Sequence, residues 1–98
     1  MIVAKVVGNV WATRKHTSLT GHKLLLVKQI EPLTGAFIGA TMMAVDGGVD
    51  AGPGDTVLML DEGGSARKVL KDDEAPVRAL ICGVVDAASN SKQVKKYA

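Results

Sequence analysis

The sequence is poor in the residues that mark disulfide scaffolds, aromatic binding surfaces and membrane spans. It has a single cysteine, Cys82, so no disulfide can form within the chain. Aromatic residues make up only 3% of it. No apolar run approaches the roughly 18 residues that a membrane span needs. The amino terminus lacks a basic leader and a cleavage site. These features predict a cytoplasmic protein without a membrane segment.

The length and composition indicate one globular domain with a thin core. A chain of 98 residues is too short to divide into several domains. A domain of this size buries roughly 60–70% of the surface that its unfolded chain exposes. Hydrophobic residues make up 47% of the chain, which excludes a disordered composition. Any further apolar surface must be covered by a partner.

The net charge of +2 conceals a separation of the two signs along the chain. Residues 1–30 carry five lysines and arginines and no acid, whereas residues 31–62 carry six acids and no lysine or arginine. The sequence ends in a basic stretch, "SKQVKKYA". Such blocks form either solvated faces or complementary patches that meet across a subunit contact.

Five segments show the apolar patterns of β-strands. They are predicted at Ile2–Trp11, Lys23–Ile30, about 40–45, Thr56–Leu60 and about 77–85. One short helix is predicted in "GGSARKVL" (63–70), where Ser65 can cap the first turn. The tail from Ala88 is expected to be loose. The pattern predicts a mainly β fold, a small five-stranded OB-like barrel with one short helix.

Three of the predicted strands are apolar on both faces. They contain "KLLLV", "TVLML" and "ALICGVV". Strands of this kind are covered on both sides in folded proteins. One short helix cannot cover that much sheet, and contiguous apolar surface on a small domain usually marks an interface. The chain is therefore predicted to form an oligomer.

The segment "VDGGVDAGPGDTVLML" (45–60) contains four glycines and a proline before it turns apolar. A phosphate cradle needs glycines that lead into a helix, whose free N–H groups hold the anion. Here the glycines lead into a predicted strand, and Asp46, Asp50 and Asp55 would repel a phosphate. The segment is interpreted as a turn that uses glycine for positive φ.

No catalytic or metal-binding arrangement emerges from the sequence. His16 and His22 lie six residues apart in a polar stretch without a cysteine partner, a spacing typical of solvated loop histidines. Ser18 and Ser65 have no base that the sequence identifies. Cys82 lies in an apolar run and is interpreted as a small buried hydrophobe. The sequence predicts no enzyme activity, no cofactor and no metal.

An OB-like barrel also raises an alternative, a module that binds single-stranded nucleic acid. Such sites combine a basic groove with aromatic stacking platforms. This chain offers Trp11 beside Arg14 and Lys15, and few other residues of these kinds. We predict no nucleic-acid partner, but the alternative stays open at this point.

The sequence resembles a known family in four blocks that agree in order and spacing. They are "AKVVGNVWATRKHTSLTGHKLLLV" (4–27), "AVDGGVDAGPGDTVLML" (44–60), "GGSARKVL" (63–70) and "PVRALICGVVD" (76–86). They resemble the signatures of bacterial microcompartment vertex proteins of the EutN/CcmL type. The resemblance covers residues 1–87, which we take as the barrel domain, followed by a basic C-terminal tail at 88–98.

The resemblance implies a structural protein that forms a homopentamer. Pentamers of this family close the vertices of a polyhedral shell around metabolic enzymes, beside hexamer-forming shell proteins. It places the glycine-rich segment near the five-fold opening. The residues carried over to that opening are Gly47, Gly48, Asp50, Ala51, Gly52 and Gly54. The candidates for subunit or shell contacts are Trp11, Arg14, Lys15 and Arg67. The family often has "GAGVGE" where this chain has "DAGPGD".

Overall fold

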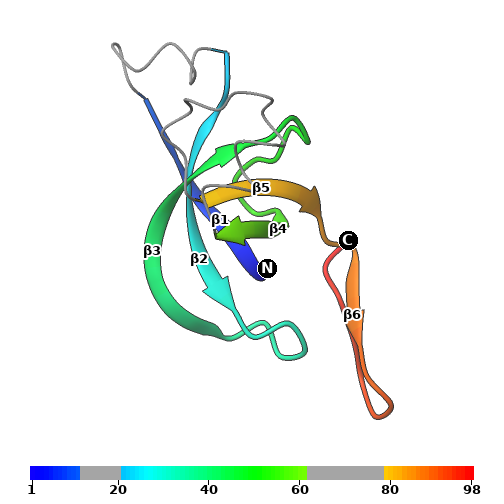
Figure 1. The fold of residues 1–98 in the computed structure, drawn as a ribbon. Helices are drawn as coiled ribbons and strands as arrows, with labels where there is room; N and C mark the ends of the chain where they lie inside the picture. The colour runs from blue at the N-terminus through cyan, green and yellow to red at the C-terminus, as the bar shows by residue number, and fades with distance from the viewer. Residues whose placement is uncertain (12–20, 62–78) are drawn as a thin grey trace.

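The computed structural model describes residues 1–11, 21–61 and 79–98, which form seven strands (Figure 1). Five of them build a barrel, and the last two form a separate hairpin at the carboxyl end. Their bounds are β1 Ile2–Val10, β2 Leu24–Ile30, β3 Phe37–Asp46, β4 Thr56–Asp61, β5 Ala79–Val84, β6 Ala87–Ser89 and β7 Val94–Lys96.

The barrel closes in the order β1-β2-β3-β5-β4, with β4 returning to β1. All neighbouring strands run antiparallel except β3 and β5, which pair in parallel at Val45–Leu80 and Asp46–Ile81. The register of β1 against β2 shifts between Val6 and Gly8. Irregularities of this kind bend a strand and increase its twist, which helps a small sheet to close.

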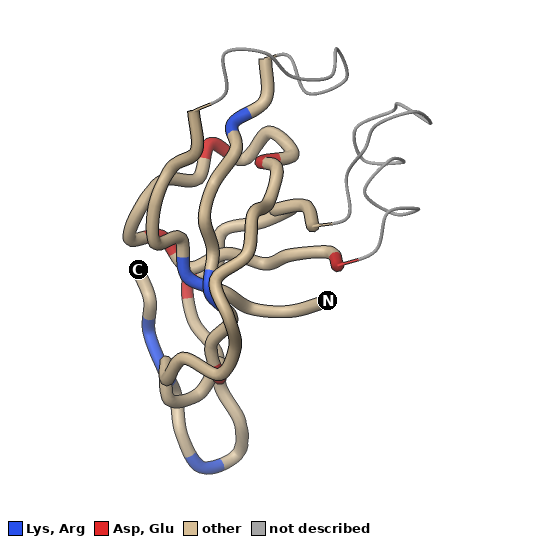
Figure 2. Tube along the Cα trace, turned by 90° about the vertical axis from the view of Figure 1, so that its left-hand side faces the viewer, with Lys and Arg blue, Asp and Glu red and all other residues tan. Residues whose placement is uncertain are grey.

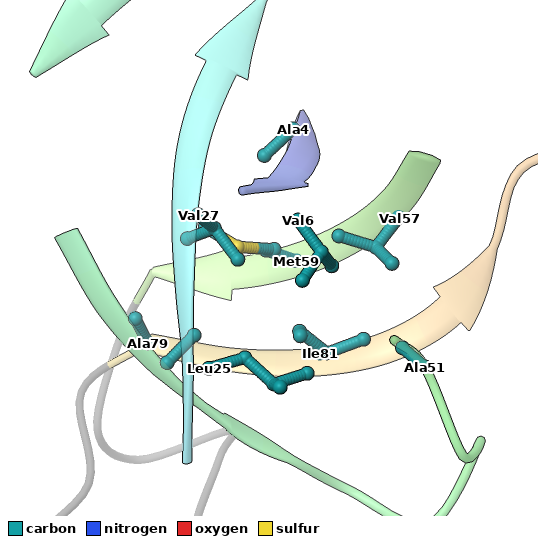
Figure 3. Close-up of a cluster of buried hydrophobic side chains, with 10 residues drawn as sticks. Ala4, Val6, Leu25, Val27, Ala51, Val57, Met59, Ala79 and Ile81 are labelled. Carbon is teal, nitrogen blue, oxygen red and sulfur yellow. The ribbon is translucent and has the colours of Figure 1, made fainter. Parts of the chain in front are cut away.

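The core follows from the alternation of side chains along each strand. Ala4 and Val6 of β1 point inwards, as do Leu25 and Val27 of β2. Figure 3 shows these side chains meeting others from β4 and β5 inside the barrel. The rest of the cluster is Ala44, Ala51, Val57, Met59, Ala79 and Ile81. Burial of this apolar surface is the main force that holds the barrel together.

The predicted five-stranded barrel is confirmed, and the largest difference among the described strand bounds is at the start of β3. β3 begins at Phe37, three residues before the predicted start. Gly39 lies within this extension, and glycine in a strand weakens the local pattern from which strands are predicted. The helix predicted at 63–70 lies outside the described residues. No helix within the described ranges is long and apolar enough to cross a membrane.

The two-sided apolar strands are covered unequally. The outward residues Leu24 and Leu26 of β2 and Leu58 and Leu60 of β4 are only half-buried. By contrast, Leu80 is fully buried within one subunit, next to Val45 across the β3–β5 pair. The expectation that a single chain leaves these strands uncovered is therefore wrong for the start of β5 and holds for the outer faces of β2 and β4.

The C-terminal segment is not loose, and the sequence prediction is wrong on this point. β6 and β7 form an antiparallel hairpin that extends beyond the barrel wall (Figure 1). The Asn90 side chain accepts the backbone N–H groups of Lys92 and Gln93, which shapes the turn between the two strands. At its base the N–H groups of Tyr97 and Ala98 both donate to the Asp86 carbonyl.

The hairpin is also fastened to the turn between β2 and β3. The Tyr97 hydroxyl donates to the Pro32 carbonyl, and the side-chain amide of Gln93 donates to the Leu33 carbonyl at 3.3 Å. Partial burial, and to a lesser extent the nearby Glu31 carboxylate, raise the pKa of Tyr97 above its ordinary value. The phenol therefore keeps its proton at neutral pH, as a hydrogen-bond donor must.

Candidate functional site

The glycine-rich segment forms a loop of residues 47–55 between β3 and β4, called here the glycine loop. All six residues predicted for the opening lie in it. Gly48, Asp50 and Gly54 are exposed, whereas Ala51 is fully buried and belongs to the barrel core. The Ala51 side chain thus anchors the middle of the loop in the core, while residues before and after it are exposed.

Asp46, the last residue of β3, organises the first half of the glycine loop. Its side chain is only 4% exposed. One carboxylate oxygen accepts the N–H groups of Gly48 and Val49 at 2.7 and 2.8 Å, and the other accepts the buried N–H of Ala51 at 2.8 Å. A carboxylate is the side chain best suited to satisfy three converging donors.

The second half of the loop is fastened to β1. The Gly54 N–H donates to the Val6 carbonyl at 2.9 Å, and the Val6 N–H donates to the Asp55 carbonyl at 2.9 Å. The Asp55 side chain accepts the Gly52 N–H at 3.0 Å. Gly54 has φ of +93°, a conformation that side chains other than glycine adopt at a cost. The loop is a well-bonded turn, as its sequence predicts.

Lys23, the residue before β2, binds the glycine loop through its side chain. Its ammonium group forms an ion pair with Asp50 and donates to the Ala51 carbonyl at 3.0 Å. Asp50 has φ of +57°, which aspartate tolerates better than most residues. Lys23 comes from the basic block of the sequence and Asp50 from the acidic block, so this pair joins the two blocks within one chain.

The geometry leaves little capacity for chemistry in the glycine loop. The N–H groups of Gly48, Val49, Ala51 and Gly52 are all held by the carboxylates of Asp46 and Asp55. An anion would have to displace these carboxylates, against their own negative charge. Across the described ranges, no group of three or more His, Cys, Asp and Glu side chains is placed to hold a metal ion.

The predicted contact residues are only partly placed by the structure. Trp11 lies at the end of β1 with 91% of its surface exposed. Arg14, Lys15 and Arg67 lie outside the described residues. Two residues that sequence reasoning missed are Asp46 and Lys23. The signal for Asp46 was an aspartate followed by two glycines directly after a strand, the pattern of a side chain that caps its own turn.

Comparisons with known proteins agree with this architecture over almost the whole chain. Residues 1–86 match the family model described as "Ethanolamine utilisation protein EutN/carboxysome". The chain belongs to the EutN/CcmL family. It is 36% identical over 94 residues to the "Bacterial microcompartment shell vertex protein EutN" of Escherichia coli (strain K12), with 96% of each chain covered.

Solved structures of EutN/CcmL proteins have the same fold. A structure titled "Ethanolamine utilization protein, EutN" superposes with a TM-score of 0.85 at 36% identity, covering 96% of this chain and 95% of that one. The "GrpN pentameric microcompartment shell protein from Rhodospirillum rubrum" superposes with a TM-score of 0.79 at 34% identity, covering 92% and 99%. The family resemblance stated from the sequence blocks is confirmed.

This EutN/CcmL chain departs from the pattern that its family often shows in the glycine loop. Pro53 stands at an exposed turn position, and Asp55 stands where the family often has glutamate. The shorter Asp55 side chain accepts the N–H of Gly52, three residues earlier. With these residues, the second half of the loop keeps the hydrogen bonds to Asp55 and to β1.

The Lys23–Asp50 pair predicts how the glycine loop responds to pH. The hydrogen bond from Lys23, followed by its charge, lowers the pKa of Asp50, and the same hydrogen bond raises the pKa of Lys23. The ion pair therefore makes its full contribution to stability between about pH 4 and pH 10, the ordinary pKa values of the two groups. The contribution is lost as the pH falls through the lowered pKa of Asp50 or rises through the raised pKa of Lys23.

Carbon-detected NMR of the Asp50 carboxyl group should show titration below the ordinary range, accompanied by shifts of the Lys23 side chain and the Ala51 amide. Asp50→Asn keeps a residue that tolerates positive φ but removes the charge, so it should abolish the acid-range shifts of Lys23. Persistence of those shifts in the variant would show that another acid causes them.

Proposed function

We propose that this protein is a structural component of a bacterial microcompartment shell, in which it forms pentamers at the vertices. The observation that carries the proposal is the near full-length match to a named shell vertex protein, together with the closed barrel shared with a pentameric shell protein. As a shell component it encloses enzymes rather than acting as one, and it needs no cofactor. Shell proteins that form hexamers are its expected neighbours.

The outer surface of the barrel supports assembly into a ring. Met43 of β3 is 56% exposed and lies directly opposite the half-buried Leu26 of β2. Phe37 and Ile38, at the start of β3, are 50% and 56% exposed. Large apolar side chains gathered on one strand are typical of a surface that another subunit covers.

β3 also has a free edge. On one side it pairs with β2 from Phe37 to Val45, but on the other it pairs with β5 only at Val45 and Asp46. Within the described ranges, the remaining part of that edge has no strand partner. An exposed apolar edge invites uncontrolled pairing between chains, and a closed ring removes that risk. We infer that β3 supplies one of the two contact surfaces, and that Trp11, Arg14, Lys15 and Arg67 contribute elsewhere.

In a ring the glycine loop would lie towards the five-fold axis. The hydrogen bonds within the loop support this placement, because a narrow opening needs a loop of fixed shape. Gly47, Gly48, Asp50, Ala51, Gly52 and Gly54 keep this proposed role. The alternative function, binding of single-stranded nucleic acid, gains no support, because the relatives named above are shell proteins and Trp11 and Tyr97 line two different cavities.

Native mass spectrometry of the purified protein at micromolar concentration should show a five-subunit species. Met43→Asp places a charge in the apolar surface of β3 and should shift the population towards monomers. Asn90→Asp adds the same charge at the hairpin turn and retains an acceptor for the two N–H groups there. It should leave the pentamer intact. A monomeric or six-subunit parent protein would contradict the vertex role.

A further inference from the structure

A cavity of about 240 Å³ lies between the C-terminal hairpin and the barrel. It is bounded by β1 and the start of β4 on the barrel side, by the turn that follows β2, and by β7 of the hairpin. The polar side chains that line it are Lys5, Thr34, Thr56, Lys95, Lys96 and Tyr97. Of the glycine-loop residues carried over to the opening, Gly54 alone lines this cavity.

The residues that line the cavity carry a net positive formal charge. Three lysines line it, and its lining includes no aspartate or glutamate. Lys5, Lys95 and Lys96 form no ion pair with another described residue. Figure 2 shows lysines and arginines in blue, with one such stretch close to the carboxyl terminus.

A fourth lysine makes the arrangement less favourable still. Lys5 of β1 lies directly opposite Lys28 of β2 in the strand register. Like charges in that position destabilise a sheet. The Lys28 ammonium lies 4.9 Å from the centre of the Phe37 ring. The repulsion around Lys5 is thus only partly relieved within the chain, and an anion in the cavity would relieve it further.

Two acids adjoin lining residues along the chain, Glu31 and Asp55, and both carboxylates accept backbone N–H groups of their own turns. The Glu31 carboxylate is engaged by the backbone N–H groups of Leu33 and Thr34, at 2.9 and 2.8 Å, in the turn after β2. The Thr34 hydroxyl accepts the Ala36 N–H and so keeps its own hydrogen for a further acceptor. Among the described residues, the ammonium groups that line the cavity have no carboxylate partner, and that of Lys95 lies 5.9 Å from the centre of the Tyr97 ring.

We propose that this cavity binds a small multivalent oxyanion of the phosphate class. Lysine ammonium groups bind phosphate as point charges, and charge-assisted hydrogen bonds are the strongest that a surface site can offer. The volume equals that of roughly eight water molecules in the liquid, and it is below the roughly 300 Å³ at which pockets for drug-sized ligands begin. A cavity of this size suits inorganic phosphate or a small phosphate ester.

Such an anion would join the hairpin to the barrel. Lys95 and Lys96 lie on β7, whereas Lys5 lies on β1. The hairpin is otherwise fastened to the barrel by its base at Asp86 and by the Tyr97 and Gln93 contacts with the turn. Occupancy of the cavity should therefore restrict the hairpin, which is a second observable besides binding itself.

Titration of the assembled protein with inorganic phosphate, followed by calorimetry and amide NMR at constant ionic strength set by chloride, tests the proposal. We expect saturable binding at one site per subunit, with shifts at Lys5, Thr34 and Lys95. A parallel titration with glycerol phosphate separates the two sources of the ligand. Tighter binding of the ester assigns the site to an organic phosphate, and tighter binding of the free ion assigns it to inorganic phosphate.

Matched substitutions decide whether the cavity is responsible. Lys95→Gln and Lys5→Gln should each weaken phosphate binding about tenfold or more, the effect of one charge close to the ligand. Lys92→Gln removes the same charge at the exposed turn of the same hairpin, outside the cavity, and should change binding little. Native mass spectrometry and circular dichroism establish that each variant is folded and assembled.

Hydrogen exchange at the Gln93–Asn90 end of the hairpin provides an independent measurement. Phosphate should slow the exchange of the Asn90 amide, which donates to the Gln93 carbonyl, in the parent protein and not in Lys95→Gln. The proposal is overturned if phosphate binding does not saturate, or if Lys92→Gln weakens it as much as Lys95→Gln does. Either result would mean a general attraction of anions to a basic surface.

Discussion

Asp46→Ala should be among the most damaging single substitutions in the chain, lowering the free energy of unfolding by about 3–5 kcal/mol. The change removes one buried carboxylate that accepts three backbone N–H groups. One of those donors, the N–H of Ala51, is buried and would lose its partner without gaining access to water. Because Ala51 belongs to the core, the loss reaches beyond the glycine loop.

Equilibrium unfolding in urea, at one fixed protein concentration, measures this effect. For a domain of this size the loss corresponds to a decrease of more than roughly 10 °C in Tm. Asp55→Ala is the matched control, since that carboxylate accepts only the Gly52 N–H in the same loop. It should cost about 1–2 kcal/mol. If the two variants lose equal stability, Asp46 does not organise the loop as described.

Asp46→Asn refines the same test. An asparagine carbonyl can still accept the N–H groups of Gly48 and Val49, as one carboxylate oxygen does. Its NH₂ group would face the Ala51 N–H, where two donors meet. We expect a loss between those of Asp55→Ala and Asp46→Ala. A loss as small as that of Asp55→Ala would mean that the Ala51 hydrogen bond contributes little.

Much of the barrel could be predicted because strand positions depend on local pattern. Alternation puts Ala4 and Val6 on the same face of the first strand, and both are buried. The glycines and aspartates of the glycine loop indicated a turn, and hydrogen bonds within residues 46–55 form one. The family was recognisable because four blocks occur in a fixed order along the chain.

The remaining features depend on contacts between distant segments. Lys23 and Asp50 are 27 positions apart, and only the closed barrel brings them together. The hairpin is held by the Tyr97 hydroxyl, which donates a hydrogen bond to the Pro32 carbonyl in the turn after β2. The basic sequence "SKQVKKYA" alone does not indicate this hydrogen bond. Leu80 looks like an exposed position in the alternation, but the neighbouring β3 and the glycine loop lie over it.

Gly47 is the point at which this long-range packing can be tested most sharply. A Cβ atom added there would lie 2.8 Å from the Ile81 carbonyl oxygen, closer than real Cβ atoms approach. The same carbonyl accepts the Gly47 N–H at 2.9 Å, so the two strands cannot separate without losing a hydrogen bond. Leu80, 3.4 Å from the added atom, blocks movement to the side.

Gly47→Ala should therefore destabilise the protein by about 2–3 kcal/mol, the usual effect of overpacking at a rigid site. Gly52→Ala, five residues along the same loop, provides the control. Nothing lies within 4 Å of an added Cβ there, and its φ is ordinary, so its stability should change by less than about 0.5 kcal/mol. Urea unfolding of both variants compares them directly. Equal stabilities would mean that the β3–β5 junction yields easily, and that the parallel pairing of Val45 with Leu80 and of Asp46 with Ile81 is not what holds the loop against the barrel.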